Sequence, residues 1–150
     1  MKEFQVKNLA GVKAETTDQG PGNVFSIKPI TDPIVMEKCA AAFVEVEPGN
    51  TAFGYHWHET VEEIFYIISG EGIIRTSKGD VPVKAGDVIC FPTGEGGSHV
   101  IRNSSAMEKL VYLDFGTRGE CEIAHLIDAK KILVIGKSGM GVYDEPEGMK

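Results

Sequence analysis

The stretch from residue 56 to residue 70 constrains this chain most, because two histidines there lead directly into a β-prone run. His56 and His58 stand two positions apart, and in an extended strand side chains at that spacing leave the same face. Glu63 directly precedes residues 64–68, which are all aromatic or β-branched. Imidazole and carboxylate groups that point into one space are typical ligands of first-row transition metals. The stretch therefore predicts strand structure and outlines a metal site.

The other two histidines differ in their sequence context. His99 lies far along the chain, just after a second β-prone run that ends in Pro92. It is therefore a candidate third imidazole for the same site. His125 stands apart from these segments, and we expect it at the surface or in an interface and not at a metal.

The spacing of these residues resembles the two motifs of the cupin superfamily. The first motif reads His-x-His, three or four residues, Glu, six residues, Gly, and it is matched by His56, His58, Glu63 and Gly70. The second reads Gly, five residues, Pro-x-Gly, two residues, His, three residues, Asn. Its counterparts are Gly86, Pro92, Gly94, His99 and Asn103. One departure is that four residues, not two, separate Gly94 from His99. The glycine that usually opens the first motif also has no counterpart at its place.

The resemblance implies an all-β fold, a double-stranded β-helix or jelly-roll barrel. It implies one cupin domain over residues 1–150, with a core at about 41–115 and flanking arms at 1–40 and 116–150. Small cupins commonly pair through their sheets and swap terminal strands, so a homodimer is expected. The apolar runs 24–27 and 132–135 are too short to form cores of their own and must be buried against a sheet edge or a neighbour.

The resemblance also assigns His56, His58, Glu63 and His99 as metal ligands. Three nitrogens and one oxygen suit a divalent Zn, Fe, Mn, Ni or Co ion, and the sequence does not choose among them. Glu62 competes with Glu63, but strand alternation places the two on opposite faces and the six-residue interval to Gly70 favours Glu63. Glu59 and Glu62 are then solvated turn charges. The alternative is a cupin domain that keeps these residues with an empty or structural site.

The charge balance narrows the range of partners. With 15 basic and 22 acidic residues, the net charge of −7 argues against a nucleic-acid surface and against docking on anionic lipid. No apolar run approaches the ~20 residues of a membrane helix, and the N-terminus has no apolar signal core.

The three cysteines are widely spaced, so we expect a cytoplasmic protein with reduced thiols. Cys90, within a β-prone run, is expected to be a buried small hydrophobe.

Strand-like segments separated by turn residues run through most of the chain and indicate a sandwich or small barrel. No helical period appears between residues 40 and 115, and 136–141 is expected to be a loop. Trp57 alternates with the two histidines and should point away from the metal into the core. The strands are expected at 24–28, 39–47, 55–58, 63–69, 73–76, 80–84, 88–91, 107–115, 121–126 and 131–135.

We expect a metal-dependent enzyme that acts on a small anionic or carbonyl-bearing metabolite, of dioxygenase, isomerase or epimerase, decarboxylase or lyase type. The alternative is a non-catalytic module that binds a sugar or carboxylate through the same metal, and a structural or storage role is a third. No Ser-His-Asp or Cys-His set is visible, so the catalytic residues stay unassigned and the chemistry runs through the metal. Arg75 and Arg102 are candidate contacts of an anionic substrate, although each alone is an ordinary surface charge.

Overall fold

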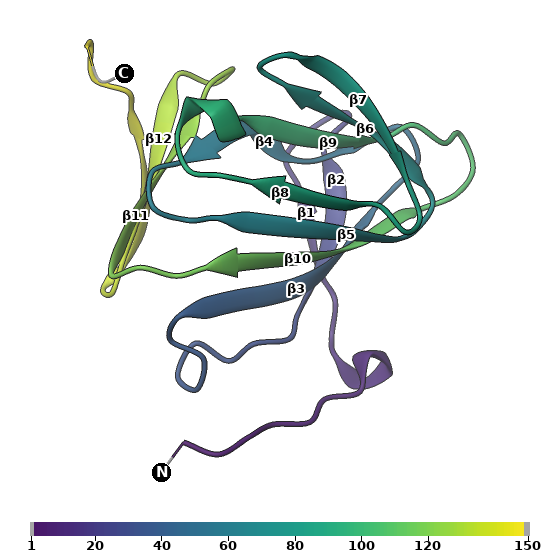
Figure 1. Cartoon of the computed structure of the whole chain (residues 1–150), viewed down its shortest axis with the longest axis horizontal. Coiled ribbons are helices and arrows are strands. Elements are labelled where there is room, and N and C mark those ends of the chain that lie inside the picture. The colour runs from purple at the N-terminus through teal and green to yellow at the C-terminus, as the bar shows by residue number, and fades with distance from the viewer. Residues whose placement is uncertain (1, 149–150) are drawn as a thin grey trace.

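The computed structural model describes residues 2–148, which fold into two antiparallel sheets that face each other across a common core (Figure 1). The first sheet has the strand order β1-β2-β3-β10-β5-β8, and the second has the order β13-β12-β11-β4-β9-β6-β7. Neighbours that are distant in sequence, such as β3 beside β10 and β4 beside β9, produce the double-stranded β-helix. The predicted all-β jelly-roll class is confirmed. No helix among the described residues has the length and apolar character needed to span a membrane.

The strand bounds follow the alternating pattern and its turns. The first sheet contains β1 (Glu15–Asp18), β2 (Val24–Pro29), β3 (Cys39–Val46), β10 (Leu110–Thr117), β5 (Glu63–Ser69) and β8 (Val88–Phe91). The second contains β13 (Gly139–Asp144), β12 (Lys131–Gly136), β11 (Cys121–Leu126), β4 (Thr51–His58), β9 (His99–Asn103), β6 (Glu71–Thr76) and β7 (Gly79–Lys84). Two 3₁₀ turns, η1 (Leu9–Gly11) and η2 (Glu95–Gly97), complete the described elements.

The core lies between the sheets, where alternate side chains of each strand point inward. Val44 and Val46 of β3 are fully buried, as are Ile67 of β5 and Tyr112 of β10. The predicted alternation in residues 43–47, with the two valines on one face, is therefore confirmed. Asn103, expected to be a turn or hydrogen-bonding residue, is fully buried, and its amide donates to two backbone carbonyls.

An irregularity in β4 positions the histidines. Ala52 of β4 lies opposite Ile101 of β9, whereas His56 lies opposite His99. Four steps along β4 therefore match two steps along β9, and residues 53–55 bulge out of the regular ladder. Phe53 adopts a φ of 59° in this bulge. The bulge brings the first motif's histidine pair level with the histidine of the second motif.

Several local expectations were wrong. The predicted loop 136–141 is instead a tight hairpin, because β12 ends at Gly136 and β13 begins at Gly139. Strand β1 and strand β9 had no counterpart among the predicted segments, and the strand expected from residue 107 begins at Leu110. Cys90 is exposed and not buried, because it lies on the outward face of edge strand β8.

Candidate metal centre

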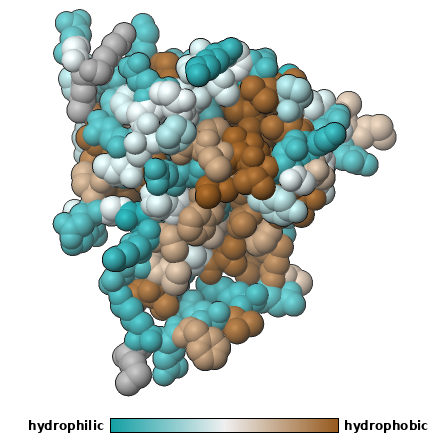
Figure 2. Space-filling view, viewed as in Figure 1, coloured by the Kyte–Doolittle hydropathy of each residue, from teal (hydrophilic) through white to brown (hydrophobic). Residues whose placement is uncertain are grey.

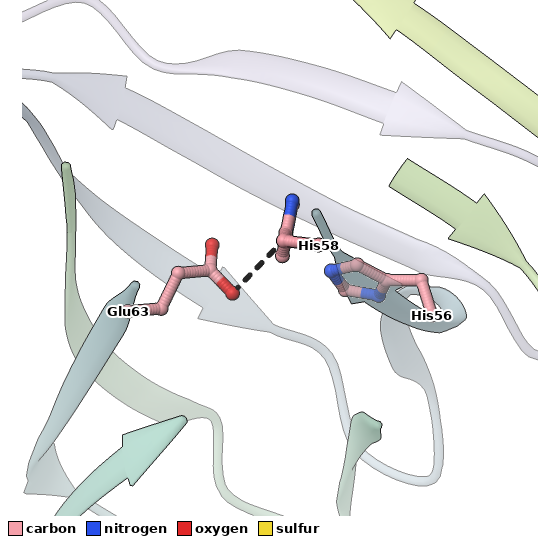
Figure 3. Close-up of side chains that lie close together, drawn as sticks. All are labelled: His56, His58 and Glu63. Atoms are coloured by element: carbon pink, nitrogen blue, oxygen red, sulfur yellow. Dashed lines mark ion pairs between the residues drawn. The ribbon is translucent and has the colours of Figure 1, made fainter. Parts of the chain in front are cut away.

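Three strands bring four potential ligands to one place inside the barrel. His56 and His58 come from β4, Glu63 opens β5, and His99 opens β9. The Nε2 atoms of His58 and His99 each lie 3.2 Å from Oε2 of Glu63. The His56 ring lies with its centroid 4.5 Å from that of His99. Figure 3 shows Glu63 facing His58 and His56, and these three residues form a cluster that can hold a metal ion.

The second nitrogen of each imidazole is already engaged. Nδ1 of His56 lies 2.7 Å from the Gly54 carbonyl oxygen, and Nδ1 of His99 lies 2.9 Å from that of Gly97. Nδ1 of His58 lies 3.1 Å from Oε1 of Glu122. Because all three acceptors are oxygens, each Nδ1 carries the hydrogen and donates it. The Nε2 lone pairs are left for a metal, which is the arrangement seen in histidine metal sites.

Three polar atoms at the centre have no hydrogen-bond partner among residues 2–148. They are Nε2 of His58, Nε2 of His99 and Oε2 of Glu63, and all three are buried. Unpaired buried polar atoms cost free energy, and they are rare in folded proteins without an ion, a water or a functional reason. Their convergence on one point, with two nitrogen donors and one carboxylate oxygen, fits a divalent transition metal.

The electrostatics keep Glu63 and His56 in their ligating forms. Burial raises the pKa of Glu63, but the adjacent His58 and His99 outweigh burial and hold it well below its usual range. Burial, together with His99 and His58, lowers the pKa of His56 to about 4. Burial lowers the pKa of His58, yet Glu63 and Glu122 outweigh it and raise that pKa overall. At neutral pH Glu63 is therefore ionised and His56 is neutral, as metal binding requires.

Glu122 of β11 supports the site but was not singled out in the sequence. Its side chain is buried and accepts from Nδ1 of His58, from the backbone N–H groups of Glu59 and Thr60, and from the Thr60 hydroxyl. These bonds fix the His58 ring and the turn that leads from β4 to Glu63. Its only sequence signal is an acidic residue in a predicted strand, because Glu122 lies far from both motifs.

A second carboxyl group, Asp114 of β10, lines the same cavity. Burial, reinforced by the negative charge of Glu63, raises the pKa of Asp114 to about 8, so the group is mostly protonated at neutral pH. Tyr112, two residues earlier on the same face, has a buried hydroxyl with no hydrogen-bond partner among the described residues. Asp114 is thus a proton-carrying group beside the histidine cluster, and its strand lies outside both motifs.

The cluster opens into a cavity of about 930 Å³. Both candidate arginines line it: Arg75 forms a two-pronged ion pair with Asp128, at 2.7 and 3.1 Å, and Arg102 is exposed. The Arg75 guanidinium also lies 4.0 Å from the centre of the Tyr55 ring. A ligand in this cavity therefore has cationic groups within the same enclosure as the histidines.

The remaining residues considered in the sequence, Glu62, His125 and Trp57, lie away from the four potential ligands. Glu62 is exposed, as expected for a solvated charge. His125 was expected at the surface or in an interface, but it is 2% exposed within its own chain, because its ring stacks on Trp57 at 3.8 Å and its nitrogens contact Glu59 and Glu145. Trp57 points away from the cluster as expected, although it packs on His125 outside the barrel core.

The comparison with known families matches the motifs and the fold. A family model described as "Cupin domain" matches residues 42–116, which is half of the chain. The chain belongs to the cupin family. The match spans β3 to β10 and thus contains all four potential ligands.

Two curated relatives are named for oxalate. The chain is 48% identical over 63 residues to an "Oxalate-binding protein" of Thermotoga maritima, a match that covers 42% of this chain and 50% of that protein. It is 33% identical over 120 residues to a "Probable oxalate decarboxylase" of Arthroderma benhamiae, over 74% of this chain and 27% of that protein. The chain thus spans half or less of the length of each.

Solved structures resemble the whole chain. A sugar phosphate isomerase of the cupin superfamily from Silicibacter pomeroyi superimposes with a TM-score of 0.83 at 21% identity, over 94% of this chain and 93% of that one. At this identity the similarity shows the fold alone. A predicted oxalate decarboxylase from Thermotoga maritima gives 0.65 at 25% identity, over 75% of this chain and 98% of that one.

Proposed function

We propose that this protein is a divalent-metal cupin enzyme whose substrate is a small carboxylate or carbonyl-bearing acid, with His56, His58, Glu63 and His99 as the metal ligands. The observation that carries the proposal is the convergence of unpartnered, buried ligand atoms while every Nδ1 is held by an oxygen. A bound divalent ion would supply Lewis acidity toward a substrate oxygen. Zn, Fe, Mn, Ni and Co all accept this donor set.

The chain's own residues supply binding and proton transfer. Burial and the charge of Glu63 raise the pKa of Asp114 in the metal-free site, and in its protonated form Asp114 would donate a hydrogen bond to an anionic ligand. Arg75, which is paired with Asp128, and Arg102 line the same cavity and are candidate contacts of a negatively charged ligand. The two relatives named for oxalate make this diacid the first compound to test.

A non-catalytic binding module is the second candidate. It is favoured by the relative named as an oxalate-binding protein, whose name specifies binding. The same metal and the same carboxylate contacts would serve both roles. The two candidates differ only in whether the ligand is converted.

The deciding experiment begins with elemental analysis of protein purified without a metal-affinity tag. We expect close to one divalent ion per chain, either as purified or after dialysis against Mn, Fe, Co, Ni or Zn. The loaded protein is then incubated with oxalate, small 2-oxo acids and sugar phosphates. Product formation supports the enzyme, and saturable binding without product supports the module. A protein that takes up none of these ions would refute the metal site.

We also propose that the protein is a homodimer. The support is a set of exposed large hydrophobic side chains on the outer face of the first sheet, including Ile64, Tyr66 and Val88. Monomeric proteins rarely leave contiguous apolar faces of this kind in water.

A further inference from the structure

The C-terminal strands add an apolar wall to the cavity that holds the histidine cluster. Ala124 of β11 lies opposite His58, and Leu133 of β12 lies between Ala124 and Val142 of β13. Apolar side chains therefore run from the ligands outward across three strands. We call this set the hairpin wall, and its members all line the cavity: Ala124, Leu126, Leu133, Ile135 and Val142.

The hairpin wall is unusual because it is apolar and partly open to solvent. Val142 is 55% exposed and Ile135 is 38% exposed, although both line a cavity. No member of the wall is charged or polar. The charged residues that line the cavity lie on other strands and in turns. The cavity thus has chelating and charged groups, and its side formed by the C-terminal strands is apolar.

The size of the cavity also exceeds what a two-carbon diacid fills. At about 930 Å³ it lies at the upper end of the ~300–1,000 Å³ typical of small-molecule sites. When a ligand covers apolar surface, the complex is stabilised by about 25 cal/mol for each Å² removed from water. A ligand that only chelates the metal would leave the hairpin wall uncovered and forgo this gain.

We propose that the ligand is a chelating acid with an apolar body, namely a 2-oxo or 2-hydroxy carboxylate with an aliphatic or aromatic chain that lies on the hairpin wall. This inference rests on the proposed metal site. The carboxylate and the neighbouring oxygen occupy the histidine end of the cavity, near Asp114. The chain extends over Leu133 and reaches Val142 and Ile135.

The test measures how affinity depends on chain length. The full chain is loaded with Co²⁺, and its visible spectrum is followed on addition of oxalate, pyruvate, 4-methyl-2-oxopentanoate and phenylpyruvate. Each buried methylene contributes a factor of about four in affinity, so the two longer acids should bind at least about tenfold more tightly than pyruvate. Equal affinities, or tightest binding of oxalate, would overturn the inference while leaving the metal site intact. No spectral response to any acid would overturn the proposed function together with it.

Variants at the adjacent residues Val142 and Tyr143 of β13, which face opposite sides of the sheet, compare the wall with its outer face. Val142→Ser on β13 and Leu133→Ser on β12 should remove the preference for the longer acids over pyruvate. Tyr143→Ser changes the adjacent residue of β13, which faces the opposite side, and should keep the preference. Val142 is more than half exposed, so its variant keeps the test valid if Leu133→Ser does not fold. If Val142→Ser keeps the preference and instead halves the mass of an oligomer, the wall is a subunit contact and the inference fails.

Discussion

Glu62 and Glu63 are adjacent in the chain, yet only one of them reaches the histidines. The Glu63 carboxylate lies 3.2 Å from two imidazole nitrogens, whereas Glu62 is exposed. Glu63→Gln should lower the affinity for a divalent metal at least about tenfold, because it replaces the anionic ligand with a neutral one. Glu62→Gln is the matched control and should bind metal as the wild type does. Metal titration followed by elemental analysis measures the metal affinity of both variants, and full occupancy in Glu63→Gln would contradict the assignment of Glu63 as a ligand.

Acidification should release the metal. Metal binds the neutral imidazole, whose reference pKa is about 6.5, so protons compete with the metal as the pH falls, although His56, with a pKa of about 4, resists protonation longest. His58 is the most sensitive, because Glu63 and Glu122 outweigh burial and raise its pKa in the metal-free site. Glu63 keeps its charge over this range, since its pKa is held low. Metal content that stays constant on dialysis well below this pH would count against a histidine-dominated site.

His125 is expected to stabilise the fold as a cation. Burial lowers its pKa, but Glu59 and Glu145 outweigh burial and raise it. A raised folded-state pKa means that the stabilisation is complete below the unfolded value of about 6.5 and is lost as the pH rises through the folded value. His125→Gln should therefore cost about 1–2 kcal/mol near pH 6 and less near pH 9. Thermal melts at both values measure this, and a cost that grows with pH would contradict it.

The individual site residues were predictable only where spacing carried the information. The four candidate ligands lie within two motifs, and the structure brings them together. Glu122 and Asp114 were missed, because each reaches the site through a strand pairing that no local pattern encodes. The burial of His125 was missed for the same reason, since its two carboxylate partners lie 66 and 20 residues away in the chain.

At the scale of elements, the longer loop before His99 has a simple structural explanation. Three of the four residues after Gly94 form the 3₁₀ turn η2, with Ser98 as its C-cap, and a 2.9 Å bond from the Gly97 N–H to the Gly94 carbonyl closes the turn. The turn absorbs the two extra residues, and His99 still enters β9 opposite His56. Despite the departure from the motif, Nε2 of His99 therefore lies 3.2 Å from Oε2 of Glu63, beside the cluster of His56, His58 and Glu63.

Gly97 in this turn should tolerate no side chain. A Cβ there would lie 1.9 Å from the Pro92 carbonyl oxygen, whereas at Gly96 it would meet nothing within 4 Å. Gly97→Ala should cost about 1–3 kcal/mol and weaken metal binding, because the Gly97 carbonyl also accepts from His99 Nδ1. Gly96→Ala should stay within about 0.5 kcal/mol of wild type. Denaturant melts and metal titration test the pair, and equal behaviour of the two variants would contradict this role of the turn.

Strands with strong alternation were predictable, and those stabilised only by a neighbour were not. The bounds of β5 and β8 were predicted from their β-prone residues. Strand β13 contains two glycines within its first three residues and has no local strand signal, so its structure depends on pairing with β12. Strand β1 is wholly polar and likewise depends on β2.

For the whole molecule, the apolar run 24–27 is already buried within its own chain. Strand β2 pairs with β3 of the same sheet, and Phe25 is 1% exposed. Exposed apolar side chains also lie on the outer face of β5, β8 and β10, where Figure 2 shows hydrophobic side chains gathered. Ile64 and Phe115 lie opposite each other on this face, as do Tyr66 and Val88.

This outer face is the expected dimer interface. The two-fold axis of a dimer would place the face against its own copy and cover these side chains. Light scattering after size exclusion should then give twice the 16.2 kDa chain mass.

Tyr66→Lys combined with Val88→Lys places charges on the face and should give a 16.2 kDa species that keeps its metal content, because both side chains point away from the cluster. Met107→Lys, at a residue 88% exposed in a loop, is the control and should stay dimeric. A wild-type mass of 16.2 kDa over a wide concentration range would refute the dimer.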